Sequence, residues 1–133
     1  MRIFYSPSSD PILLGPGAEL NVLYAHLSEF LASSETTISL PAEVTGSPAP
    51  YQQFLPGLRL KKTHDLVCLS FAEDGWLELS GSASYLSQYV SHFRFDPPGN
   101  DGHHHPDNAN YIASGSLRLI IEADSNWGEA NDG

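Results

Sequence analysis

The chain has little of three things: cysteine, basic side chains and long apolar runs. Its single cysteine, Cys68, excludes an internal disulfide. Six basic residues stand against sixteen acidic ones, for a formal net charge of −10, and this surplus opposes binding to nucleic acid or anionic membranes. No apolar run is long enough to span a bilayer, and the first residues lack a signal-peptide core. We therefore expect a cytoplasmic protein.

Common catalytic signatures are also missing. Gly15-Pro16-Gly17 has proline where a phosphate-binding loop needs a backbone donor. No Gly-x-Ser-x-Gly nucleophile elbow occurs. We expect a protein that is not an enzyme and has no cofactor.

Two helices are predicted from apolar spacing. The first runs from about Ala18 to Ala32, with Leu20, Leu23 and Leu27 on one face. The second follows Gly81-Ser82, and either Ser82 or Ser84 suits its N-cap.

Short β-branched or alternating segments predict the strands, which are residues 2–5, 12–14, 36–40, 58–61, 66–71, 76–80 and 116–123. Asp74-Gly75 marks a hairpin turn between two of them. Residues 41–56 are rich in proline and predict an irregular surface segment of unassigned role. Cys68 is expected in the core. The predicted fold class is α+β, with two helices packed on one face of a single, mostly antiparallel β-sheet.

The length of 133 residues predicts a single domain. Its halves resemble each other, because Gly15-Pro16-Gly17 aligns with Gly81-Ser82-Ala83, and the same offset pairs His26 with His92. This pattern predicts two similar ββαβ halves, 1–64 and 65–124, followed by a flexible acidic tail over 125–133.

A triple histidine lies in a Gly/Pro/Asn/Asp-rich stretch, Gly102 to Asp107, which predicts a loop. His103 and His105 would project the same way and could chelate one ion, with Asp107 or Asp101 as a third ligand. The spacing is not that of a dedicated metal motif, so we expect no bound metal. We expect one histidine to pack against the sheet and donate to a backbone carbonyl, while the others face water.

A catalytic interpretation of the same region stays open as the alternative. His105 with Asp107 would be a base and its orienting acid, and Ser114 or Ser116 the nucleophile. A metal-binding or small hydrolytic protein using His103, His104, His105 and Asp107 is therefore the second hypothesis. Ser114-Gly115-Ser116 is also typical of a turn that starts the last strand.

Protein binding is the first hypothesis. Acidic residues in turns and tails stay exposed and would steer a basic partner. An isolated tryptophan and a tyrosine are suitable anchors. The predicted partner-binding residues, all in the second half, are Glu73, Asp74, Asp101, His103, His104, His105, Asp107, Tyr111, Glu122, Asp124 and Trp127.

A family resemblance supports this hypothesis. Four segments carry it, over about Leu66 to Asp124: Trp76 to Ser82, the helix that reaches His92-Phe93, Gly102 to Pro106, and Gly115 to Glu122. In these the chain resembles small bacterial immunity proteins of polymorphic toxin systems. The resemblance implies stoichiometric inhibition of a cognate toxin in the cytoplasm, and it implies no catalytic residues.

Overall fold

The computed structural model describes residues 1–96, 102–106 and 110–124. In this part of the chain the strands are β1 (Arg2–Tyr5), β2 (Ile12–Gly15), β3 (Thr37–Pro41), β4 (Gln53–Phe54), β5 (Gly57–Lys62), β6 (Cys68–Phe71), β7 (Leu77–Gly81), β8 (Gly102–His104) and β9 (Ile120–Ala123). The helices are α1 (Gly17–Ala32) and α2 (Ala83–Val90), and α2 continues into a 3-10 turn, η1 (Ser91–Phe93). None of the described helices is long and apolar enough to cross a membrane.

The strands form two hydrogen-bonded sheets, one with the order β4-β1-β2-β9-β8 and the other with the order β3-β5-β7-β6. Neighbouring strands are antiparallel except in the pairs β2–β9 and β5–β7. The predicted α+β class with mostly antiparallel strands is confirmed. The strands do not form a single sheet, however, because β2 and β7 each take a parallel partner from the other half of the chain.

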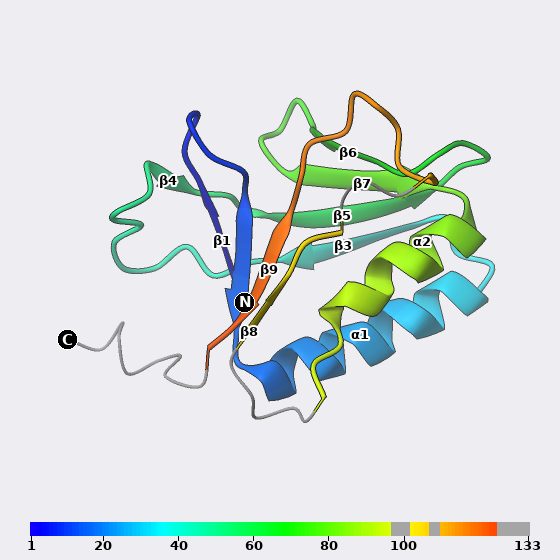
Figure 1. The fold of residues 1–133 in the computed structure, drawn as a ribbon, viewed down its shortest axis with the longest axis horizontal. Helices are drawn as coiled ribbons and strands as arrows, with labels where there is room; N and C mark the ends of the chain where they lie inside the picture. Colours follow the sequence, from blue (N-terminus) through cyan, green and yellow to red (C-terminus); the bar gives the residue numbers. More distant parts are fainter. Residues whose placement is uncertain (97–101, 107–109, 125–133) are drawn as a thin grey trace.

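The two helices lie side by side and are packed against the sheets (Figure 1). Leu20, Leu27 and Phe30 of α1 are buried, as are Leu86 and Tyr89 of α2. The strands contribute alternate residues to the same core; in β5 and β7 these are Leu58, Leu60, Leu77 and Leu79. The Ser82 hydroxyl accepts the Tyr85 N–H at 3.3 Å and so caps α2, which confirms one of the two predicted caps.

The hairpins of the two halves share one strand register. Ile3 pairs with Leu13 in the first hairpin and Leu69 pairs with Leu79 in the second, so both partners are displaced by 66 positions. The same displacement relates Ile38 of β3 to His104 of β8, but their partners, Leu60 and Ile121, are 61 positions apart, so this second register does not repeat. The division at 64/65 stays a prediction.

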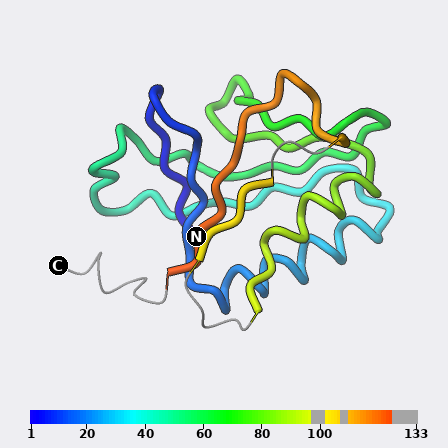
Figure 2. The backbone as a smooth tube through the Cα atoms, in the orientation of Figure 1, coloured from blue at the N-terminus to red at the C-terminus, as the bar shows by residue number. Residues whose placement is uncertain are grey.

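The Pro-rich segment covers the outer edge of the first hairpin. The Leu55 N–H donates to the Ile3 carbonyl and the Gln52 N–H to the Tyr5 carbonyl. Residues 111–117 cover the outer edge of the second hairpin in the same way, since the Leu117 N–H donates to the Leu69 carbonyl. Both segments follow their hairpins as loops in the backbone trace (Figure 2).

Several predicted details are wrong. His103 and His104 lie on strand β8 rather than on a loop, because β9 offers them a free antiparallel edge. The last strand begins at Ile120, not at residue 116, because the preceding residues turn and bond to β6. Cys68 is half-buried rather than in the core, because it lies on the outward row of β6. The predicted tail, 125–133, lies outside the described residues.

Candidate functional site

Of the three consecutive histidines, His104 is the one with contacts that hold the fold together. Its ring is half-buried and stacks on Phe95, with ring centroids 4.3 Å apart and planes 2° apart. Its Nδ1 lies 2.6 Å from the His92 carbonyl oxygen, and since a carbonyl only accepts, Nδ1 donates. His103 and His105 are exposed. The expectation of one packed histidine and two exposed ones is therefore confirmed.

His103 and His105 project together, with ring centroids 4.9 Å apart. They offer two nitrogen ligands, whereas zinc in proteins takes three or four protein ligands. The described residues contain no group of three or more His, Cys, Asp or Glu side chains placed to hold a metal. Asp101 and Asp107, the predicted third ligands, lie outside the described residues.

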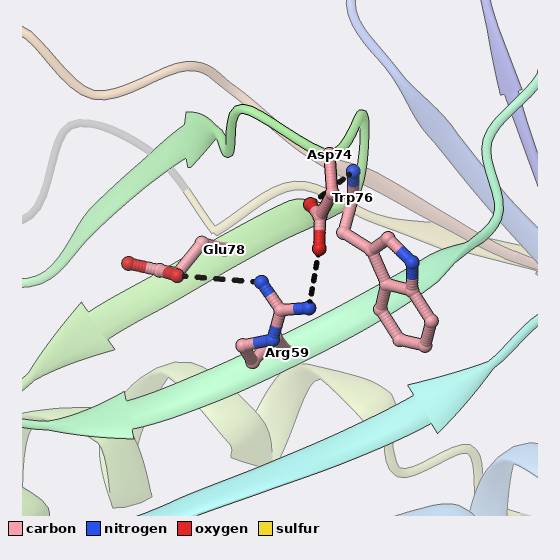
Figure 3. Close-up of polar contacts among 4 residues, drawn as sticks. All are labelled: Arg59, Asp74, Trp76 and Glu78. Atoms are coloured by element: carbon pink, nitrogen blue, oxygen red, sulfur yellow. Dashed lines mark hydrogen bonds and ion pairs between the residues drawn. The ribbon is translucent and has the colours of Figure 1, made fainter.

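Asp74 is exposed, but its charge is paired within the chain, in a cluster with Arg59, Trp76 and Glu78 (Figure 3). Its carboxylate accepts from Arg59 at 2.8 Å and from the Trp76 N–H at 3.2 Å. Glu78 lies 3.7 Å from the same guanidinium, which sits 5.1 Å from the centre of the Trp76 ring. The Arg59 hydrogen bond lowers the pKa of Asp74, and it raises the pKa of Arg59. The adjacent Glu73 is exposed and has no ion pair within the described residues.

Ser116 also has a structural role. Its hydroxyl accepts the Leu69 N–H at 2.8 Å and donates to the Leu117 carbonyl at 2.9 Å. Ser114 is exposed in the turn that precedes it. The structure therefore places Ser116 where it joins the last segment to β6.

The remaining predicted partner-binding residues are dispersed. Tyr111 is half-buried and stacks on Tyr85 at 5.9 Å, and burial raises the pKa of its hydroxyl. Glu122 is half-buried opposite His103, and the Asp124 N–H donates to the Gly15 carbonyl. Trp127 lies outside the described residues. The structure brings Glu122 next to His103, whereas Asp74 and Tyr111 contact residues outside the set.

A groove between α1 and β3 is the feature that sequence reasoning missed. One part has a volume of about 360 Å³ and a second part about 200 Å³, and His26 lines both. The first part is lined by Met1, Glu19, Val22, Leu23, His26, Leu40 and Pro41. The second is lined by His26, Glu29, Phe30, Ser33, Glu35 and Ile38. The groove thus follows the length of α1.

The walls of this groove are apolar and its rim is acidic. Leu23, Phe30 and Leu40 supply packed apolar surface, and Val22 is 70% exposed. The Glu19 carboxylate accepts from the chain's amino terminus at 2.6 Å. Glu29 and Glu35 are exposed, and neither has an ion pair among the described residues. A concave apolar surface with few polar groups is typical of binding sites.

The edge of β3 beside the groove is open. The Lys62 N–H donates to the Thr36 carbonyl and the Ala42 N–H to the Pro56 carbonyl, so even-numbered β3 residues bond to β5. Thr37 and Ser39 therefore direct their N–H and C=O groups away from β5. No other described strand pairs with this edge.

The corresponding place in the second half is closed. His92 and His104 stand 66 positions after His26 and Ile38, and they contact each other through the 2.6 Å hydrogen bond to the His92 carbonyl. Phe95 covers the His104 ring, and Asn21 of α1 bonds to both the N–H and the carbonyl of Phe95 at 2.8 Å. The groove of the first half is the open member of the pair.

One sequence signal could have located this groove. Val22 is apolar but lies off the buried face of α1, beside Glu19 and His26. Its significance depends on β3 being an edge strand, which is a matter of long-range pairing.

Comparison of the chain with models of known families, with curated proteins and with solved structures finds no match.

Proposed function

We propose that the protein acts by binding another protein, as an immunity protein that neutralises a cognate secreted toxin stoichiometrically. The observation that carries this proposal is the open apolar groove between α1 and the unpaired edge of β3. Exposed apolar surface on a folded protein marks an interaction site when it is concave and contiguous. The resemblance of residues 66–124 to immunity proteins supports the same class of function.

Two of the groups named in the catalytic alternative have structural roles. Ser116 joins β6 to the final segment, and His104 donates to the His92 carbonyl. Neither contact leaves the group aimed at a substrate. This favours binding over the hydrolytic alternative.

Charge supports a basic partner. The net charge of −10 would accelerate association with a positively charged surface at low salt. Glu73 contributes to that field as an exposed acid, whereas the charge of Asp74 is offset by Arg59. Toxins that act on nucleic acid need a basic active-site surface, which an acidic inhibitor can cover.

The groove replaces the second half as the proposed main contact surface. The second-half prediction rested on exposed acids, histidines and an isolated tryptophan. Asp74, Tyr111 and His104 of that set are engaged in contacts within the chain, while the two hollows of the groove lie next to each other along α1 and share His26. Glu73 keeps a predicted role in long-range steering, whereas His103 and His105 are counted as neutral in the net charge of −10 and add nothing to it.

The proposed function predicts that a gene next to this chain's own encodes the cognate toxin domain, and that domain is the probe that tests it. Wild-type protein is expected to protect cells producing that domain and to form a one-to-one complex with it. Val22→Arg is expected to weaken the complex about a hundredfold, because it places a charge in the apolar contact. Titration calorimetry and cell survival measure the two effects.

Val44→Arg is the matched control, because Val44 is likewise an exposed valine, at 55%, but lies outside the groove. It is expected to leave affinity within about threefold of wild type, as surface changes outside the contact usually do. Equal losses for both variants would contradict the groove as the contact surface. Failure of the wild-type chain to bind or protect would contradict the function itself.

A further inference from the structure

Resting on the proposed function, we propose that the groove receives an extended, basic segment of the partner as an added strand on the edge of β3. Such a segment would place apolar side chains at every second position, directed into the groove, and would carry lysine or arginine at its end next to Thr37, toward Glu35 of the acidic rim. This is recognition by β-strand addition, in which backbone bonds supply affinity and pockets supply specificity.

The backbone of β3 sets the length of the added strand. Thr37 and Ser39 each present one N–H and one C=O at the open edge. Pro41 has no N–H and so ends the pairing. Five residues of strand span about 17 Å, which matches a short extended peptide rather than a helix.

The side chains of β3 set the direction of the apolar contacts. Ile38 and Leu40 line the groove, so the sheet face that an added strand would extend is the face turned toward α1. Alternate residues of that strand would point the same way, toward Val22 and Leu23. An apolar residue at every second position fills this space.

The acidic residues at the rim of the groove favour a basic occupant. Glu29 and Glu35 line the groove, whereas Glu19 is already paired with the amino terminus. Lys62, the nearby cation, donates to the Ser33 carbonyl at 2.7 Å and lies 4.6 Å from the centre of the Phe30 ring. A second copy of this chain would bring another charge of −10 to the same edge, so a basic segment is favoured over self-association.

The second half shows the kind of group that closes this space. There the chain itself supplies an aromatic residue, Phe95, which stacks on His104, the counterpart of Ile38. In the first half the residue at the same displacement from Phe95 is Glu29, an exposed acid rather than an aromatic residue, so an apolar side chain from outside would take the equivalent place.

Amide hydrogen exchange of the full-length chain tests the inference directly. The probe, the lysine–valine peptide, is a short capped peptide with valine at every second position, threonine between the valines and lysine at its ends, and the matched control has glutamate at its ends. In the free protein the Thr37 and Ser39 amides are expected to exchange quickly, and those of Ile38 and Leu40 slowly. The lysine–valine peptide is expected to slow exchange at Thr37 and Ser39 alone by about tenfold or more.

Ser39→Pro provides a second readout. It removes an edge donor at a position equivalent to Pro41, where proline already occurs, so the fold is expected to persist by circular dichroism. Peptide affinity is expected to fall about tenfold. Persistent fast exchange at Thr37 and Ser39, equal effects of the acidic peptide, or a concentration-dependent dimer that Ser39→Pro abolishes would each overturn the inference.

The outcomes separate this inference from the proposed function. A chain that neutralises the toxin while Thr37 and Ser39 stay unprotected in the complex retains the function and loses strand addition. A chain that binds the lysine–valine peptide through β3 but ignores the toxin retains strand addition and loses the immunity function.

Discussion

The negative charge of Asp74 contributes to the stability of the fold. Its pKa is lowered chiefly by the hydrogen bond from Arg59, so its contribution to stability is present above the ordinary pKa of an unfolded aspartate. That contribution is lost as the pH falls through the lowered folded value. Asp74→Asn keeps an acceptor for the Trp76 N–H and removes the charge. We expect it to lower the urea midpoint at neutral pH and to match wild type in strong acid.

Glu73→Gln is the control for this prediction. Glu73 precedes Asp74 in the same turn and has no ion pair among the described residues. Its neutral variant should keep the wild-type urea midpoint at both pH values. A pH-independent loss in Asp74→Asn would mean that shape, not charge, is what the cluster needs.

The exposed histidine pair carries a second prediction at this scale. Untagged protein dialysed against a mild chelator is expected to contain no stoichiometric zinc, because His103 and His105 supply only two described ligands. Elemental analysis measures the metal. One equivalent of zinc that disappears in the double variant His103→Ala/His105→Ala would favour the metal-binding alternative.

At the scale of elements, the close contact between Gly57 of β5 and Trp76, the residue before β7, gives a prediction for stability. A Cβ at Gly57 would lie 2.3 Å from the Trp76 ring and 2.6 Å from the Leu40 carbonyl. Gly57→Ala must therefore displace Trp76 or separate β3 from β5. We expect a loss of about 1–3 kcal/mol in the free energy of unfolding, measured by urea denaturation.

Gly115→Ala is the matched control, because a Cβ there meets no heavy atom within 4 Å. Its free energy of unfolding should stay within about 0.5 kcal/mol of wild type. The pair thus compares the same chemical change at a closed and an open position. Equal losses would show that chain flexibility, rather than the Trp76 contact, governs the cost.

Local elements were predictable from the sequence because their signals are local. The second hairpin turns at Asp74-Gly75, where Gly75 has φ of +87°, and Ser82 caps α2 as its position predicts. The parallel pairing of β2 with β9 was not predictable, since nothing near Ile12 specifies Ile120 as its neighbour. For the same reason the sequence did not reveal the groove, which exists because β3 ends a sheet.

At the scale of the whole molecule, charge and shape divide the work of recognition. The net charge of −10 acts at long range and is screened by salt. The groove acts only on contact, so a groove variant should change dissociation while charge variants change association. This division explains how scattered acids contribute without forming the contact surface.

The parallel pairing between halves also constrains how the chain is made. Strand β2 cannot complete its pairing until β9 has been synthesised, and the residues of β9 emerge from the ribosome roughly a hundred positions later. Until then the β2 edge of the first hairpin is unpaired. Contacts this distant in sequence slow folding, so the first half must remain unaggregated through most of translation. The last of the described strands, β9, is therefore the one that covers the open edge of the first hairpin.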